Sequence, residues 1–272
     1  MNDLFDISGK SIVITGGAGV LGLEIAKSLA EHGARITILD IDSKLTESIA
    51  LEMQKKGFEF NAVYGDVMDI SVLKKASEKI IQTNGRIDIL INGAGGNNPK
   101  ATTGPQTTFF DLPQEALQWV INLNLIGSIL PSQIFGRIMA EQQAGIILNI
   151  SSMNALRPLT KIPAYSAAKA AVTNFTQWLA VHMAQEYSAD IRVNAIAPGF
   201  FLTRQNEFLL LEKGSRELTK RGKQIIDHTP MHRFGDPQDL TGTVLWLVSS
   251  ASRFVTGIVV PVDGGFSAYS GV

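Results

Sequence analysis

Short runs of β-branched residues alternate with longer amphipathic stretches along almost the whole chain, and this alternation constrains the fold most. Strands are expected at residues 11–15, 35–40, 60–64, 87–91, 146–150 and 191–196, with helices at about 20–32, 43–56 and 71–83 and further long helical segments before the last two strands. The strand runs are apolar almost throughout, which is typical of parallel strands covered by helices on both faces. Because parallel strands need right-handed crossovers, the pattern predicts an α/β fold with a doubly wound parallel sheet.

Two segments interrupt this alternation, but neither divides the chain. Residues 95–113 form a polar loop rich in Gly, Asn, Thr and Pro, and residues 200–230 mix an apolar run with many charges. Long insertions after strands usually cover or bind a ligand. Since there is no linker, repeat or low-complexity tract, we expect a single domain over residues 1–272, with a helical substrate lid at about 200–230.

The composition excludes several classes of protein. The absence of cysteine excludes disulfides, thiolate metal sites and a thiol nucleophile, and the four histidines have no carboxylate at ligand spacing, so no metal site is expected. The 24 basic and 25 acidic side chains nearly cancel, which gives no overall field for nucleic acid or for a membrane surface. No signal peptide or membrane-spanning run is evident, so a soluble cytoplasmic protein is expected.

A glycine-rich turn joins the first expected strand to the first helix. Gly16, Gly19 and Gly22, with Val20 and Leu21 between the last two, permit a tight turn and the close approach of a pyrophosphate at the helix N-terminus. A plain strand–helix turn is the alternative interpretation.

Asp40 strengthens the nucleotide interpretation, because it ends the second strand 18 residues beyond Gly22. A carboxylate there accepts hydrogen bonds from a ribose 2′-hydroxyl and repels a 2′-phosphate, which favours NAD over NADP. Asp40 could alternatively cap the next helix.

Tyr165 and Lys169 lie four residues apart in a segment expected to be helical to about residue 187, and therefore on one helix face. A neighbouring ammonium favours phenolate over phenol, so we expect Lys169 to lower the pKa of Tyr165 from its usual value of about 10. The pair is a candidate acid–base for an alcohol and its ketone. Alone, this spacing is also common on helix surfaces.

The chain resembles the short-chain dehydrogenase/reductase family over nearly its whole length. The motifs that carry the resemblance occur in order: the glycine-rich turn, Asp66, Asn92-Gly93-Ala94-Gly95, Asn124, Ser152 placed 13 residues before Tyr165, Tyr165 with Lys169, Pro198-Gly199 with Thr203, and Val262-Asp263-Gly264-Gly265. Two details depart from the family pattern. Val20 stands where the family usually has glycine, and Gly93 replaces the second asparagine of Asn-Asn-Ala-Gly, so the path of the diphosphate loop is left open.

The resemblance implies a role for each matching residue. Tyr165 exchanges a proton with the substrate oxygen, Ser152 hydrogen-bonds that oxygen, Lys169 holds the nicotinamide ribose, and Asn124 supports a water chain behind Lys169. Cofactor contacts are implied for the adenine at Asp66 and Val67, for the ribose at Asn92 and Ala94, and for the nicotinamide at Ile196, Pro198 and Thr203. The neighbouring Ser151 is expected to be structural. The family likeness also implies a homotetramer.

Several loop stretches are similar to a narrower group within this family, the D-mannonate oxidoreductases (fructuronate reductases) of short-chain type. That likeness implies NAD-linked interconversion of D-mannonate and D-fructuronate. The loops offer Asn97, Asn98, Asn154, Gln205 and Asn206 for hydroxyls, and Arg157, Lys161 and Arg204 for a carboxylate. Each of these could instead be a turn residue or a solvated charge. Another sugar-acid or polyol dehydrogenase, such as gluconate 5-dehydrogenase, and a non-catalytic NAD sensor are the alternatives.

Overall fold

One sheet of seven parallel strands forms the centre of the molecule in the computed structural model, which describes residues 3–203, 207–215 and 217–271. The strands are β1 (Ser11–Thr15), β2 (Arg35–Asp40), β3 (Phe60–Tyr64), β4 (Ile89–Asn92), β5 (Gly145–Ile150), β6 (Ile191–Pro198) and β7 (Val259–Val262). Their order across the sheet is β3-β2-β1-β4-β5-β6-β7. The predicted doubly wound parallel sheet is confirmed.

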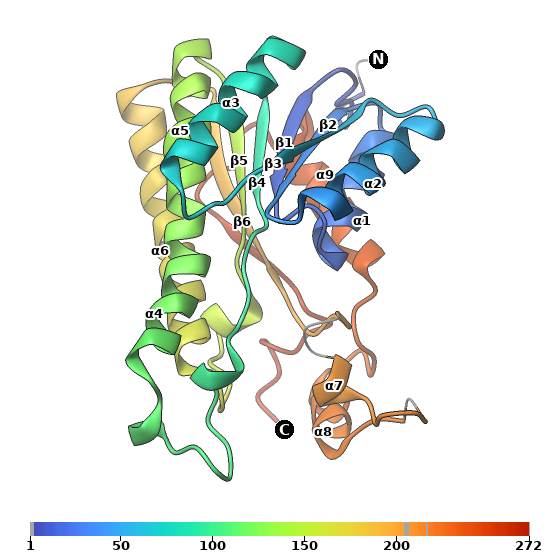
Figure 1. Cartoon of the computed structure of the whole chain (residues 1–272), viewed down its shortest axis with the longest axis vertical. Helices are drawn as coiled ribbons and strands as arrows, with labels where there is room; N and C mark the ends of the chain where they lie inside the picture. The colour runs from blue at the N-terminus through green and yellow to red at the C-terminus, as the bar shows by residue number, and fades with distance from the viewer. Residues whose placement is uncertain (1–2, 204–206, 216, 272) are drawn as a thin grey trace.

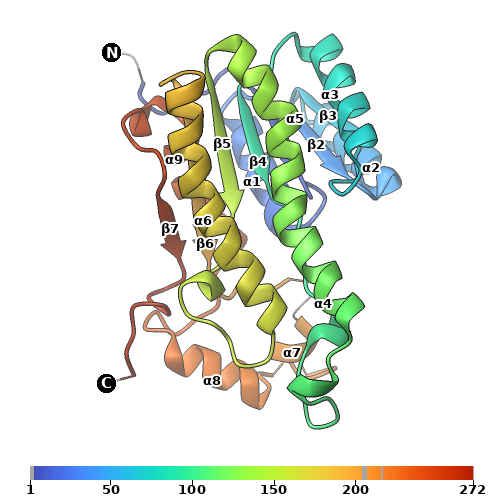
Figure 2. The same ribbon diagram turned by 90° about the vertical axis from the view of Figure 1, so that its left-hand side faces the viewer.

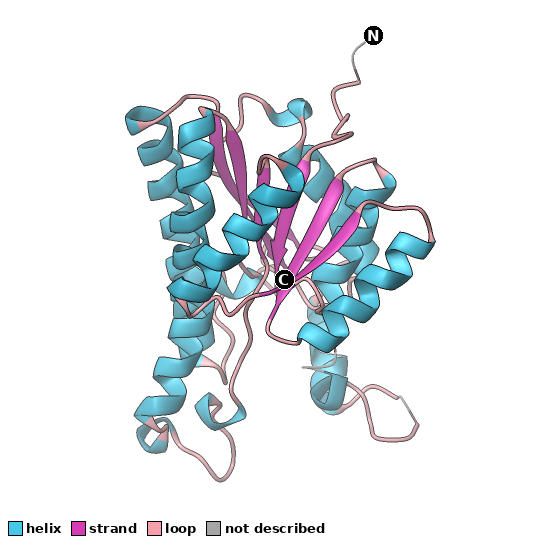
Figure 3. Ribbon diagram, turned by 45° about the horizontal axis from the view of Figure 1, so that its top comes forward, coloured by secondary structure: helices cyan, strands magenta, loops and turns pink. Residues whose placement is uncertain are grey.

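Helices cover both faces of this sheet (Figures 1 and 3). They are α1 (Val20–Glu31), α2 (Ser43–Lys55), α3 (Ile70–Asn84), α4 (Gln114–Ile121), α5 (Gly127–Gln142), α6 (Pro163–Glu186), α7 (Glu207–Leu210), α8 (Lys220–His228) and α9 (Thr241–Val248). Successive strand residues alternate between two cores, because neighbouring side chains of a strand point to opposite faces. Ile12 and Ile14 of β1 join the core under α1, α2 and α9, whereas Val13 joins the core under α3, α5 and α6.

Local sequence explains where several helices begin and end. Asp42 and Asp69 cap α2 and α3 by accepting hydrogen bonds from backbone N–H groups of the first turn. Gly85 ends α3 with a φ of +74°, a conformation that costs glycine least. Pro163 begins α6, a position where its missing N–H costs no helical hydrogen bond.

Strand β5 begins one residue earlier than expected, at Gly145, and β6 runs two residues further, to Pro198; the larger differences are at β4 and β7. Strand β4 begins at Ile89 rather than at Ile87, because the side chain of Gln142 bonds both the N–H and the carbonyl of Ile87. Strand β7 was not expected. It is short and contains Pro261, which a sheet tolerates at its edge (Figure 2).

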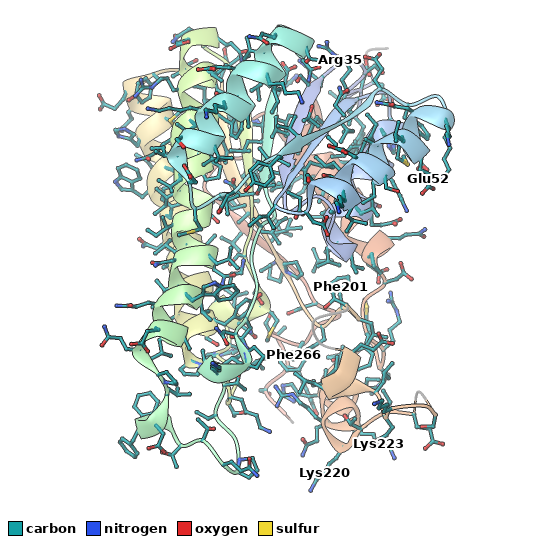
Figure 4. All side chains as sticks on the ribbon, viewed as in Figure 1. Arg35, Glu52, Phe201, Lys220, Lys223 and Phe266 are labelled. Carbon is teal, nitrogen blue, oxygen red and sulfur yellow. The ribbon has the colours of Figure 1, made fainter. Side chains whose placement is uncertain are left out.

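The carboxyl ends of the strands face the segment of residues 200–230, which contains α7 and α8 (Figure 1). Apolar side chains connect this segment to the body of the protein: Leu210 and Ile225 pack in one cluster with Met153 and Phe266. Figure 4 places Phe201 and Phe266 between the sheet and these two helices, while Lys220 and Lys223 point outward from α8. In the described part of the chain, no helix is long and apolar enough to cross a membrane.

Candidate active site

The candidate site lies at the carboxyl edge of the sheet, where the strand order changes direction between β1 and β4. In open parallel sheets this position leaves a crevice for a ligand, because the helices that follow the two strands cover opposite faces. Thr15 and Asn92 pair across β1 and β4 at this edge, and Asn149 follows on β5. The loops that follow β1, β4 and β5 therefore begin side by side.

The glycine-rich turn between β1 and α1 has no room for larger side chains. Gly16 has a φ of +64°, and a Cβ there would lie 2.7 Å from the Cα of Ala94. A Cβ on Gly22 would lie 2.6 Å from the carbonyl oxygen of Gly16. Gly19 is the N-cap of α1, and no side chain caps that helix. The backbone N–H groups that start α1, at Val20 and Leu21, are thus available for an anion such as a pyrophosphate.

Asp40 lies beside this turn at the end of β2. Its Oδ2 accepts a hydrogen bond from the N–H of Ala18 at 3.2 Å, and its Oδ1 accepts one from the N–H of Asp42 at 3.3 Å. The cap of α2 is Asp42 and not Asp40, which removes the alternative interpretation of Asp40. A half-buried carboxylate next to an anion-binding turn fits a dinucleotide with a free ribose 2′-hydroxyl.

The residues implied for the rest of the cofactor surround the same edge. Asp66 follows β3 and accepts a hydrogen bond from the N–H of Met68 at 2.8 Å, while Val67 is buried. Ala94 lies against Gly16, and Ile196 is buried in β6. Pro198 ends β6, and Thr203 follows in the loop beyond it.

The amide nitrogen of Asn92 is engaged within the protein, whereas its Oδ1 is buried without a hydrogen-bond partner among the described residues. Its Nδ2 donates to the Oγ of Ser132 at 2.9 Å and to the Oδ1 of Asn149 at 2.8 Å, and only 2% of the residue is exposed. Thr15, which the sequence alone did not single out, holds the neighbouring loop, because its Oγ1 accepts from the N–H groups of Gly93 and Ala94.

Ser152, Tyr165 and Lys169 come together as the sequence predicted. Ser152 lies close enough to Tyr165 for its hydroxyl to act on the phenol and lower its pKa. The Nζ of Lys169 lies 5.7 Å from the centre of the Tyr165 ring and donates to the carbonyl oxygen of Ile150 at 2.7 Å. Ser151 bonds the Oγ1 of Thr173 and the carbonyl of Lys169, so its hydroxyl serves to hold α6 against the end of β5.

The prediction that Lys169 lowers the pKa of Tyr165 is wrong, because the pKa of Tyr165 is raised. Burial is the larger influence and raises the pKa of Tyr165, while the hydroxyl of Ser152 opposes it. Burial also lowers the pKa of Lys169 from 10.5 to about 8. The sequence showed the spacing of the pair, but it could not show that Lys169 is buried and Tyr165 half-buried.

Asn124 lies in a π-helical turn, Asn122–Ile126, between α4 and α5. Such turns widen a helix locally and often mark functional positions. The Asn124 side chain is fully buried, and its Nδ2 donates to the carbonyls of Gly96 and Val120 while its Oδ1 accepts from the N–H of Gly96. A Cβ on Gly95 would lie 2.7 Å from that Oδ1 and 3.3 Å from the Nζ of Lys169. Asn124 and Lys169 therefore flank the same glycine.

The candidate polar residues for the substrate are either buried amides with an unpartnered oxygen, a turn cap, or residues outside the described part of the chain. Asn154 is 5% exposed, and its Oδ1 is buried with no hydrogen-bond partner. The Oδ1 of Asn97 is also buried and unpartnered, although its Nδ2 donates to Thr102. Asn98 caps the short turn Pro99–Ala101. Arg204, Gln205 and Asn206 lie outside the described residues.

The two remaining candidate cations are exposed. Arg157 donates from Nε to the carbonyl of Ser267 at 3.1 Å, which ties the loop after β5 to the C-terminal segment. Lys161 contributes its backbone carbonyl to the N–H of Thr103. Within the described residues, no group of three His, Asp or Glu side chains is placed to hold a metal ion.

Comparison with known proteins gives consistent matches over nearly the whole chain. A family model described as enoyl-(acyl carrier protein) reductase matches residues 16–267. An uncharacterized oxidoreductase of Bacillus subtilis, UxuB, is 48% identical, and the match covers 98% of each chain. The 5-keto-D-gluconate 5-reductase of Escherichia coli is 35% identical over 97% of this chain and 98% of that protein.

A solved structure from Haemophilus influenzae is also similar. It is described as a candidate D-mannonate oxidoreductase with bound NAD, is 46% identical, and superposes with a TM-score of 0.92 over 98% of each chain.

Proposed function

Because this chain belongs to the short-chain dehydrogenase/reductase family of NAD(P)-dependent oxidoreductases, we propose that it interconverts D-mannonate and D-fructuronate with NAD as its cofactor. The main support for a sugar acid as the substrate is the buried, unpartnered amide oxygen of Asn154, two residues after Ser152. A buried polar atom without a partner costs free energy unless a ligand satisfies it. A hydroxyl of a sugar acid has the chemistry to do so.

The cofactor choice rests on Asp40. Its carboxylate lies beside the turn that receives the pyrophosphate, and a 2′-phosphate in this place would meet a like charge. The similar Haemophilus structure contains NAD, which supports the same choice. When bound, NADH supplies the hydride that reduces the ketone carbon.

The protein's own residues handle the oxygen of the substrate. Ser152 hydrogen-bonds the carbonyl oxygen and polarises it, while Tyr165 delivers its hydroxyl proton to the oxygen as the alcohol forms. A raised pKa keeps Tyr165 protonated near neutral pH, so that it can act as the acid in the reducing direction. Lys169, on the same face of α6, holds the ribose next to Tyr165. Segment 200–230 then covers the site and excludes water.

A substrate panel tests the proposal. Purified protein should reduce D-fructuronate with NADH at least about tenfold more efficiently than with NADPH, and Tyr165→Phe should abolish turnover while retaining NADH binding. Asn154→Ala should raise KM for the sugar acid without changing KM for NADH. Asn84→Ala is the control, because it removes a buried amide that bonds Ser11 and Thr37 far from the site.

Two results would change the assignment. Rapid turnover of 5-ketogluconate without turnover of D-fructuronate would favour the second candidate, a gluconate 5-dehydrogenase activity, which the Escherichia coli relative supports. NADH binding with no turnover of any carbonyl in the panel would favour a non-catalytic sensor.

We also propose that the protein assembles as a homotetramer through α5 and α6, with residues 257–272 at a second interface. Large apolar side chains are exposed on α6, where Trp178 and Val181 are each 57% exposed, and on the neighbouring helix α4, where Trp119 is 49% exposed. Exposed apolar groups of this size commonly mark contacts between subunits. Light scattering that gives the mass of one chain would contradict the proposal.

A further inference from the structure

A set of buried polar side chains, joined partly to one another and partly through backbone carbonyls, connects the helix that follows Asn124 to the helix that carries Tyr165 and Lys169. On α5 it begins where the Oγ of Ser128 donates to the carbonyl of Asn124 at 2.8 Å. The Oγ of Ser132 then donates to the carbonyl of Ser128, also at 2.8 Å. Asn124, Ser128 and Ser132 are spaced four residues apart, so they form one stripe along the helix.

Two asparagines on neighbouring strands, Asn92 and Asn149, connect α5 to α6 along one face of the sheet. The Nδ2 of Asn92 on β4 donates both to the Oγ of Ser132 and to the Oδ1 of Asn149 on β5. The Nδ2 of Asn149 donates to the Oγ1 of Thr176 on α6 at 2.8 Å, and Thr176 donates in turn to the carbonyl of Val172. We name this set the polar relay: Asn124, Ser128, Ser132, Asn92, Asn149 and Thr176. Each member is at most 5% exposed.

The hydrogen bonds of the polar relay can run in only one direction. A serine or threonine hydroxyl has a single proton, and those of Ser132 and Thr176 are already given to backbone carbonyls. Both hydroxyls must therefore accept from the asparagines. Loss of the Ser132 or Thr176 hydroxyl leaves a buried amide N–H of Asn92 or Asn149 unpaired, so these four members depend on one another.

The polar relay ends on the face of α6 that holds the catalytic pair. Tyr165, Lys169, Thr173 and Thr176 follow one another at intervals of three or four residues, and the last three all bond the end of β5. On the other side, the relay meets the carbonyl of Asn124, whose side chain lies across Gly95 from the Nζ of Lys169. These bonds thus join the two sides of the site along the face of β4 and β5 that α5 and α6 cover.

We propose that Ser132, Asn92, Asn149 and Thr176 are positioning residues, which fix Asn124 relative to Tyr165 and Lys169. The strands provide a rigid base, but helices packed on them by apolar contacts alone can slide. Buried, directional hydrogen bonds restrict that movement, because a small shift would break several of them at once. A misplacement of about 1 Å at a reacting group can cost roughly a hundredfold in rate. The proposal rests on the oxidoreductase chemistry of the family and not on the choice of substrate.

Thr176→Val tests the proposal, since it removes the hydroxyl but keeps the size and branching of the side chain. We expect kcat to fall by about tenfold or more, with KM for NADH within about twofold. The pH dependence of kcat should shift, because Lys169 and Tyr165 no longer hold their relative positions. Thr176→Ser restores the hydroxyl and should restore kcat. Ser132→Ala breaks the relay on α5 and should give the same pattern.

Ser77→Ala is the matched control. Ser77 is 7% exposed on α3, and its Oγ bonds only the carbonyl of Lys74, so the variant loses a buried hydroxyl outside the polar relay. Its kcat and pH dependence should not change. A folded Thr176→Val protein with unchanged kcat and unchanged pH dependence would overturn the proposal. If Thr176→Val does not fold, Ser132→Ala decides by the same two measurements.

Amide hydrogen exchange separates this proposal from the proposed substrate. Without any substrate present, the amides of residues 124–132 and 165–176 should exchange faster in Thr176→Val and in Ser132→Ala than in Ser77→Ala. Equal exchange in all three proteins would overturn the proposal. Absence of D-fructuronate turnover in the unchanged protein would count against the substrate alone.

Discussion

Lys169 is a buried amine whose ionisation is coupled to folding. Burial lowers its pKa to about 8 in the folded protein, whereas the unfolded chain retains a pKa of 10.5. Below pH 8 both states are protonated, and the folded state bears the full cost of the buried charge. Between pH 8 and 10.5 the unfolded state binds more protons, so the free energy of unfolding rises with pH through this window.

Lys169→Met should reveal this coupling. The free energy of unfolding of the unchanged protein, measured relative to Lys169→Met by urea denaturation, should increase by about 2 kcal/mol from pH 7 to about pH 9.5. The comparison cancels other titrating groups, which the two proteins share. A difference that stays constant across this range would show that the amine of Lys169 is not withdrawn from water.

Ser152, Tyr165 and Lys169 could be predicted from the sequence because their spacing is local. The partners of Asn92 could not, since Ser132 and Asn149 lie 40 and 57 residues away and meet it only in the sheet. The polar stripe of α5 was nevertheless visible as Asn124, Ser128 and Ser132 at intervals of four. Buried serine hydroxyls on the side of a helix that faces a sheet need hydrogen-bond partners on the strands. That requirement is the signal by which the partners of Asn92 could have been predicted.

At the scale of elements, the strands that agree best with the sequence are those bounded by their own turn residues. β1, β2 and β3 have the expected limits, and Gly16 and Gly65 follow the first and third of them directly. The start of β4 depends on a side chain 55 residues away, that of Gln142, and the edge strand β7 has too few residues for a pattern. Boundaries set by distant contacts are invisible to local patterns.

The turn between β1 and α1 gives a prediction that separates backbone strain from close packing. Gly16→Ala places a Cβ against the backbone of Ala94 at a φ of +64°, whereas Gly57 has a φ of +89° and open space around it. Gly57→Ala should lower the free energy of unfolding by about 1 kcal/mol, the cost of the left-handed conformation alone. Gly16→Ala should lower it by about 3 kcal/mol, because the turn must also move.

NADH binding provides the second measurement on these two variants. The Gly16→Ala protein should bind NADH at least about tenfold more weakly, since the displaced backbone is the surface expected to meet the pyrophosphate. The Gly57→Ala protein should bind it normally. Equal losses of stability in the two variants would mean that the contact with Ala94 is not a constraint on the turn.

At the scale of the whole molecule, the C-terminal segment joins three parts of the chain that are far apart in sequence. Phe266 packs edge-on against Phe200, at 5.1 Å between ring centres, and against His228 of α8, at 4.7 Å. Ser267 accepts the hydrogen bond from Arg157, in the loop that follows Ser152. The loop that follows Ser152 and the predicted lid are therefore held together by residues near the end of the chain.

Phe266→Ala tests this connection. Loss of a buried aromatic ring from such a cluster costs about 3–5 kcal/mol locally, which should favour open arrangements of segment 200–230 over the closed one. We expect KM for the sugar acid to rise by about tenfold or more. The affinity for NADH, measured by fluorescence in the absence of substrate, should stay the same, because α1 and β2 contribute no residue to the cluster around Phe266. Phe254→Ala is the control, since that ring is fully exposed. A KM that is unchanged in Phe266→Ala would mean that the C-terminal segment and α8 do not control access to Ser152 and Tyr165.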